Sequence, residues 1–180
     1  MRKGRRGAIL SEEIDNVLLN GATRTDIKVR DGTPQLMLEV GVRDLPMLMS
    51  HVVENILTEA EARKRNLRVD KSVHYHGLGK ELFIEVIESL DRPAAIFQWQ
   101  PNSTNNYGNK DYIILTSLLN RENERIIVPI FVETRGNHLE LITGEVETID
   151  TNKVKTIYGK NHVFQFLNKY IQEGSLRKLR

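Results

Sequence analysis

The string His76-Gly77-Leu78-Gly79 carries the side chain best suited to proton transfer in this sequence. An imidazole titrates near neutral pH, so it can act as a general acid or a general base. Glycines beside a helix start let a backbone or a phosphate approach closely, and the helix dipole there favours an anion. His76 is therefore a candidate catalytic residue. The same spacing is also typical of a histidine that caps a helix or hydrogen-bonds the backbone at the edge of a core.

A second group of polar residues lies in the late string NKVKTIYGK. On a strand, Val154, Thr156 and Tyr158 would share one face, and Lys155 and Ile157 would lie on the other. Thr156 and Tyr158 would then offer two hydroxyls about one strand repeat apart, which makes both of them candidate catalytic residues. An ordinary exposed face that uses β-favouring residues would have the same pattern.

Three cationic residues are candidates for binding a substrate phosphate, and these are Lys155, Lys160 and Arg135. Lys160 follows the hydroxyl pair directly. Arg135 stands in an Arg-Gly-Asn string that indicates a turn, and a guanidinium there could present two parallel hydrogen bonds to a phosphate.

Several common kinds of site are missing from the sequence. It contains no P-loop, no GxGxxG after a strand, no GxSxG and no HExxH. It contains no cysteine, which excludes disulfides, thiolate metal sites and a cysteine nucleophile. His74 and His76 form an H-x-H pair, but no third ligand follows at a recognisable spacing. We therefore expect neither a metal nor another cofactor.

The composition is that of a globular protein, with 180 residues of which 39% are hydrophobic and 28% are charged. The formal net charge of +2 is unevenly distributed, because basic residues crowd both ends of the chain. These ends are either solvated or attract phosphates. No apolar run reaches membrane-spanning length and no signal peptide is visible, so we expect a cytoplasmic protein without a membrane partner.

Hydrophobic periodicity and capping residues predict five helices, at residues 11–20, 35–40, 51–67, 78–90 and 161–172. In the third of these, Val52 or Val53, together with Ile56, Leu57 and Ala60, is expected on one buried face. After Pro93 the period changes to two, and strands are expected at 94–99, 112–119, 126–134, 138–149 and 154–158.

This order predicts an α+β fold, in which N-terminal helices pack on a small antiparallel sheet of four to five strands with a C-terminal helix. We expect residues 1–32 to form an N-terminal extension with a short helix, and residues 33–180 to form the main domain.

From Thr33 to about Leu179 the chain resembles the C-terminal domain of phage MuF-type proteins. The resemblance is carried by TPQLMLEVG, LPMLMS, HGLG, DRPAAIF, IIVPI, TIYGK and the closing helix, which occur in the order of the family. It implies the superfold of barnase, EndoU, colicin and RelE-like nucleases, in which helices pack on a small antiparallel sheet. It also implies an RNA-cleaving toxin, with His76 matching the helix histidine of the family and Thr156 and Tyr158 matching its late-strand hydroxyl motif.

These observations together predict a phage-associated toxin domain that cleaves RNA by metal-independent transesterification, in the bacterial host cytoplasm or associated with the virion. RNA and an immunity protein are its expected partners. One alternative is a non-catalytic interaction module of a phage or mobile element, which binds nucleic acid or protein. A second is an ADP-ribosyltransferase toxin, but of the expected Arg, Ser-Thr-Ser and Glu-x-Glu series only Glu145-Val146-Glu147 is present.

Overall fold

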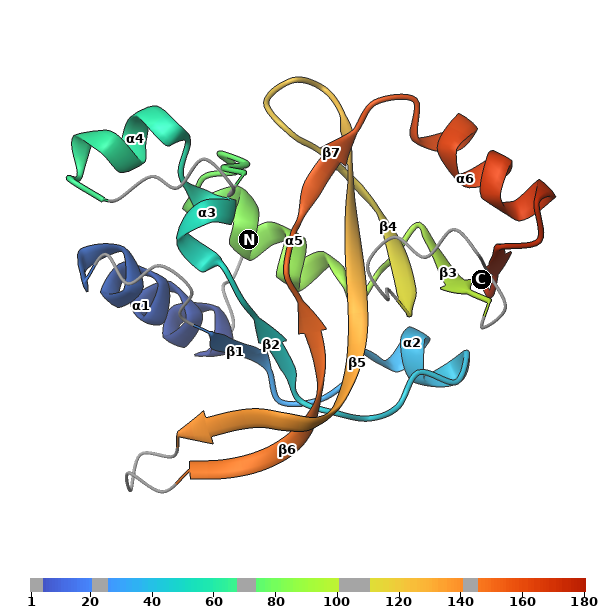
Figure 1. Ribbon diagram of the computed structural model, residues 1–180, viewed down its shortest axis with the longest axis horizontal. Helices are drawn as coiled ribbons and strands as arrows, with labels where there is room; N and C mark the ends of the chain where they lie inside the picture. Colours follow the sequence, from blue (N-terminus) through green and yellow to red (C-terminus); the bar gives the residue numbers. More distant parts are fainter. Residues whose placement is uncertain (1–4, 21–25, 68–73, 101–110, 141–145) are drawn as a thin grey trace.

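The computed structural model describes residues 5–20, 26–67, 74–100, 111–140 and 146–180, and the side chains of 5–9, 20, 134–140 and 146–149 are left out of the description (Figure 1). The helices are α1 Arg5–Asn20, α2 Gln35–Glu39, α3 Val52–Ile56, α4 Glu59–Lys64, α5 Lys80–Ser89 and α6 Val163–Gln172. The strands are β1 Ile27–Arg30, β2 Met47–Met49, β3 Ala95–Trp99, β4 Tyr112–Leu119, β5 Arg125–Glu140, β6 Val146–Val154, β7 Tyr158–Lys160 and β8 Leu176–Lys178. None of the described helices is long and apolar enough to cross a membrane.

The strands form one mixed sheet in the order β1-β2-β6-β5-β4-β3-β8, with β7 paired to β5 outside this path. The pair β2–β6 is parallel and the other pairs are antiparallel. The predicted α+β class is confirmed, but the sheet has eight strands instead of four or five and is not purely antiparallel. The strands β1, β2 and β8 were missed because they have only three or four residues, and in β2 every side chain is buried, so no alternation marks it.

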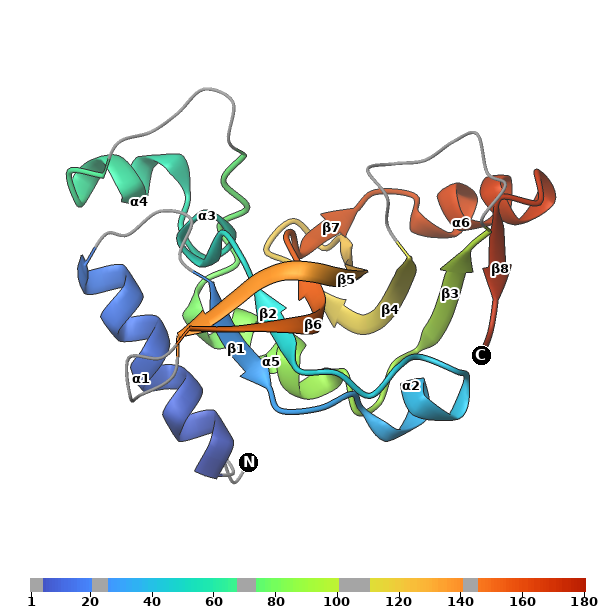
Figure 2. The same ribbon diagram turned by 60° about the horizontal axis from the view of Figure 1, so that its bottom comes forward.

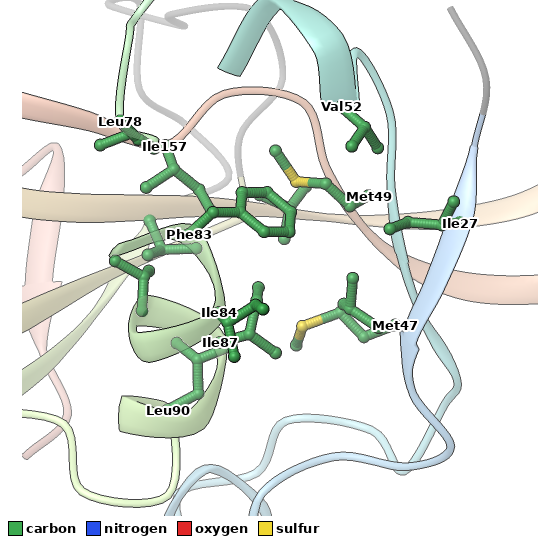
Figure 3. Packing of buried hydrophobic residues seen from close by; sticks show 14 of the residues in the cluster. Ile27, Met47, Met49, Val52, Leu78, Phe83, Ile84, Ile87, Leu90 and Ile157 are labelled. Atoms are coloured by element: carbon green, nitrogen blue, oxygen red, sulfur yellow. The ribbon is translucent and has the colours of Figure 1, made fainter. Parts of the chain in front are cut away.

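Two hydrophobic clusters hold the sheet to its helices. The larger cluster joins α1, α3 and α5 to the sheet, and Figure 3 shows Leu78, Phe83 and Ile157 within it. The smaller cluster lies under α6, where Val163 and Leu167 pack against β3 and β4. In both ribbon views α1 and α6 lie at opposite ends of the molecule (Figures 1 and 2). Both α1 and β1 contribute to the larger cluster, and the division predicted at residue 32 stays a prediction.

Two predicted helices differ from those observed. The first begins at Arg5, well before Ser11. The helix expected at 51–67 is two helices, because Leu57 is extended and Thr58 begins α4 with a capping box to Glu61. As a result Ala60 is exposed where a buried position was predicted, and Ala62 is buried instead.

Two predicted strands are interrupted. The strand expected at 138–149 is shared between the end of β5 and the start of β6, with residues 141–145 outside the described part. The strand expected at 154–158 is broken between Val154 and Tyr158.

The second break has the form of a bulge along one edge of β5. Lys153 pairs with Phe131 and Tyr158 pairs with Ile127, so the β6–β7 segment contains one more residue than its partner. The extra residue changes which side chains turn inward, since Val154 and Ile157 are both buried in the larger cluster. The predicted alternation of faces through Thr156 is therefore wrong.

The carboxamide of Asn55 holds this bulge in place. Its Nδ2 donates to the carbonyl of Lys155 at 3.0 Å, and its Oδ1 accepts from the N–H of Ile157 at 2.9 Å. The same Nδ2 lies 2.8 Å from the carbonyl of His51, which precedes α3. Asn55 is 1% exposed, so its amide replaces the missing strand hydrogen bonds in a dry environment.

Replacing Asn55 with alanine should destabilise the fold by about 2–5 kcal/mol, because each buried polar group left without a partner costs about 1–3 kcal/mol. The measurement is urea unfolding followed by the fluorescence of Trp99, the one tryptophan of the chain. Asn168→Ala on the exposed side of α6 is the control, and should change the stability by less than about 0.5 kcal/mol. Equal stabilities for the two variants would show that the Asn55 amide does not hold the bulge.

Candidate functional site

The HGLG segment closes the C-terminal end of α3. Its four successive N–H groups donate to carbonyls at that end, at distances of 2.8 to 3.1 Å, in the order Glu54, Leu57, Asn55 and Ile56. The last carbonyls of a helix have no partner inside the helix, so the segment supplies what α3 lacks. These four N–H groups are consequently engaged with protein and do not form a cradle for a phosphate.

The two glycines of this segment are required by the backbone and by close packing. Gly77 has a φ of +60°, and a Cβ there would lie 2.6 Å from Cγ2 of Thr58. Gly79 has a φ of +80°, and a Cβ there would lie 2.9 Å from Nη2 of Arg121. The close approach expected from the sequence is present, and the group that approaches is protein.

His76 and Tyr158 lie against each other. Their ring centroids are 6.2 Å apart and the ring planes differ by 29°, which is a stacked arrangement. His76 precedes α5, and Tyr158 is the first residue of β7. Asn55 joins their two segments, because its backbone carbonyl accepts from Leu78 while its side chain holds the bulge before Tyr158. The structure thus brings together two of the three residues predicted as catalytic.

The surroundings of His76 favour its neutral form. Burial lowers the pKa of His76 below its ordinary value of 6.5, and the neighbouring His74 lowers it further. Its Nε2 is buried and has no hydrogen-bond partner among the residues that the structure describes. A neutral imidazole at pH 7 can accept a proton, so the site suits a general base better than a general acid.

Thr156, the third predicted catalytic residue, lies at the bulge itself. Asn55 binds the carbonyl before it and the N–H after it, which fixes the backbone on both sides of Thr156. Its side chain is partly exposed. Thr156 precedes Tyr158 by two residues, but the bulge between β6 and β7 means that their side chains do not follow one regular strand face.

Two of the three predicted phosphate-binding residues are close to this segment. Lys155 is exposed, with its Nζ 4.9 Å from the ring centroid of Phe131. Lys160 ends β7, two residues beyond Tyr158 and on the same face of that strand, and its Nζ is 4.7 Å from the ring centroid of Phe166.

Arg135 is placed elsewhere. Its backbone lies in the other half of β5, eight residues beyond Ile127, the partner of Tyr158. Eight residues of extended strand span about 26 Å. The side chain of Arg135 lies outside the described part, and its backbone position does not bring it to the His76–Tyr158 contact.

Arg121 is a cation beside the site that the sequence did not reveal. It belongs to the connection between β4 and β5, where Asn120 accepts from the backbone N–H groups of Glu122 and Glu124. This connection packs on both halves of the site, because a Cβ at Gly159 would overlap Asn120 and a Cβ at Gly79 would contact Arg121. The sequence predicts a polar hairpin connection here. Polarity alone does not indicate which neighbouring segments the side chains of the connection contact.

A second imidazole stands at the start of α3. His51 has a left-handed backbone with a φ of +54°, and its Nδ1 lies 3.9 Å from Oε2 of Glu54. Glu54 is 3% exposed, and its backbone carbonyl is the acceptor for the N–H of His76. Among the described residues no three His, Asp or Glu side chains are grouped so that they could hold a metal ion.

The close contact at Gly77 can be tested with two substitutions. Gly77→Ala should lower stability by at least about 1–2 kcal/mol from the left-handed backbone alone, and by more from the overlap with the methyl group of Thr58. Thr58→Ser removes that methyl group and keeps the hydroxyl that caps α4. In the Gly77→Ala background it should therefore restore the part of the stability that is lost to the overlap. The measurement is a double-mutant cycle of unfolding free energies for Gly77→Ala and Thr58→Ser. Additive effects of the two substitutions would contradict this packing.

Burial of His76 should make stability depend on pH. Because the pKa of the folded state is lower than the ordinary 6.5, the unfolded chain binds the proton more readily. The contribution of His76 is fully present above pH 6.5 and is lost as the pH falls from 6.5 toward the lowered pKa of the folded state. His76→Phe should reduce this slope in unfolding experiments. Equal slopes for wild type and His76→Phe would refute the effect.

Comparison with known protein families identifies the family of this chain. The family model for the phage MuF C-terminal domain matches residues 68–178. The matched range contains His76, Tyr158 and α6, while α3 with Asn55 lies before it. No curated protein and no solved structure matches the chain. Since the match covers more than half of the 180 residues, including both sides of the His76–Tyr158 contact, the chain belongs to the phage MuF C-terminal domain family.

Proposed function

We propose that this phage-associated domain is a toxin that acts as a metal-independent endoribonuclease. The observation that carries the proposal is the desolvated His76 ring stacked on Tyr158, beside a segment with two lysines. A neutral imidazole, hydroxyl groups and cations next to one another are the groups needed to cleave an RNA phosphodiester without a metal.

In the proposed reaction the 2′-oxygen of the RNA attacks the adjacent phosphorus, and the bond from phosphorus to the 5′-oxygen breaks. His76, which burial keeps in the neutral form, takes the proton of the 2′-hydroxyl. The phenol of Tyr158 gives a proton to the departing 5′-oxygen, and the proton held by His76 returns to Tyr158 through solvent. The products are a 2′,3′-cyclic phosphate and a free 5′-hydroxyl.

The remaining groups stabilise charge on the phosphate. Thr156 supplies a hydroxyl from the bulge, and Lys155 and Lys160 supply positive charge on either side of Tyr158. Arg121 takes the place that the sequence suggested for Arg135, because a Cβ at Gly79, three residues after His76, would lie 2.9 Å from its Nη2. Such groups contribute most where negative charge develops in the transition state.

As a toxin, the domain would act on RNA in the cytoplasm of the bacterial host, whether free or carried with the virion. A cell that makes it would need an immunity protein, which would cover the face around His76 and Tyr158.

The test uses the full chain and an end-labelled RNA oligonucleotide in excess chelator. Cleavage with cyclic-phosphate ends is expected, and the all-deoxy oligonucleotide should stay intact because it lacks the attacking 2′-hydroxyl. His76→Ala should lower the rate by at least ~10²-fold, the lower end of what acid–base catalysis contributes. Tyr158→Phe and Thr156→Ala should lower it by less, and Lys160→Ala should raise KM. His162→Asn is the control, since His162 is exposed at the start of α6.

Two results would overturn the proposal. Activity lost with chelator and restored by a divalent ion would refute the metal-independent reaction. Binding of RNA without cleavage, unaffected by His76→Ala, would favour a non-catalytic interaction module.

A further inference from the structure

We propose that the surface formed by Arg125, Lys160, Phe164 and Phe166, called here the β7–α6 surface, binds single-stranded RNA and leads it to His76. This inference rests on the proposed function and adds the class of substrate and its path. It is argued from charge, from the way the cations are held, from one exposed aromatic ring and from continuity with the site.

The C-terminal part of the chain, which contributes Lys160, Phe164 and Phe166 to this surface, is strongly basic. Residues 151–180 contain seven basic side chains and one acidic side chain, Glu173. The whole chain has a net charge of only +2, so the rest is net negative. A polyanion is attracted to this basic part of the chain, and neutralising its phosphates releases counterions.

The cations of this region lie over aromatic rings. The guanidinium carbon of Arg125 is 5.7 Å from the ring centroid of Phe164, and Nζ of Lys160 is 4.7 Å from that of Phe166. Within the described part of the chain no carboxylate forms an ion pair with Arg125 or Lys160. One nitrogen of Arg125, Nη1, donates to the carbonyl of Thr116 at 3.2 Å, and this neutral acceptor leaves the charge available to a phosphate.

Phe164 is a large aromatic residue on the solvent-exposed side of α6, where it does not contribute to the core. The helix α6 buries Val163, Leu167 and Tyr170 against the smaller cluster, whereas 57% of Phe164 is accessible to solvent. An exposed aromatic ring next to cations is the arrangement on which unpaired bases stack. In a duplex the faces of the bases are covered by their neighbours, so this surface fits a single strand.

The surface is continuous with the candidate site. Lys160 is the pairing partner of Arg125, and it shares one face of β7 with Tyr158. Tyr158 and Phe166 both pack against the smaller cluster. Figures 1 and 2 show β7 leading directly into α6. A strand with a base on Phe164 and a phosphate at Lys160 therefore continues toward the His76–Tyr158 contact.

The experiment measures binding apart from cleavage, by using the chain with His76→Ala and a fluorescein-labelled single-stranded RNA of 12 nucleotides in an anisotropy titration. Phe164→Ala in this background should weaken binding at least about fivefold, since stacking of one base on an aromatic ring is worth that much or more. Lys160→Ala and Arg125→Ala should each reduce the slope of log affinity against log salt by about 0.7. Leu19→Ala is the matched control, because Leu19 is 84% exposed on α1 at the opposite end of the molecule.

Equal affinities of the Phe164→Ala and Leu19→Ala variants would overturn the inference, as would equally tight binding of a duplex of the same length. The outcome is separable from that of the proposed function. If the unmodified chain cleaves RNA and Phe164→Ala has no effect on binding, only this inference fails. If Phe164-dependent binding is present and the unmodified chain does not cleave, only the nuclease proposal fails.

Discussion

The geometry of this domain depends on one buried carboxamide. Asn55 belongs to α3, a helix of only five residues that could not persist alone. Its side chain binds the chain between β6 and β7, while the carbonyls around it receive the N–H groups of the HGLG segment. A polar group with all its partners satisfied in a dry core is directional, so it specifies one arrangement where apolar packing alone tolerates several. The relative position of His76 and Tyr158 follows from it.

Polar side chains that are buried or partly buried gather around α3. Glu54 is buried, and His51 and His76 are partly buried, beside the larger apolar cluster. Left-handed backbone at His51 and Gly77 accompanies them. Unpartnered buried atoms and unusual backbone conformations lower stability, and proteins retain them mainly where they serve a function. Buried atoms without a hydrogen-bond partner in His51, Glu54 and His76 lie around α3, which supports the choice of this region as the site.

Sequence patterns that are local in the chain predict its elements correctly, whereas contacts between distant segments leave no such pattern. Helical spacing predicts α5 and α6, and runs of β-favouring residues predict β3 and β4, because each pattern is contained within one element. Thr58 and Glu61 form the capping box that starts α4 after Leu57. The apolar periodicity continues on both sides of this break, so it predicts one helix instead of two. No pattern near Asn55 indicates that its amide binds a backbone one hundred positions later.

In the candidate site, too, the sequence predicts which side chains have suitable chemistry but not which distant residues lie together. His76 and Tyr158 could be selected because their chemistry is visible in their side chains, and the fold brings them together. Arg135 could not be separated from Arg121 by sequence, since only the path of β5 and of the connection before it decides which arginine is near. The family model begins at residue 68, after α3. A piece cut to the matched range would lose both the acceptors of the HGLG amides and the clamp on the bulge, so the unit that folds is larger than the unit by which the family is recognised.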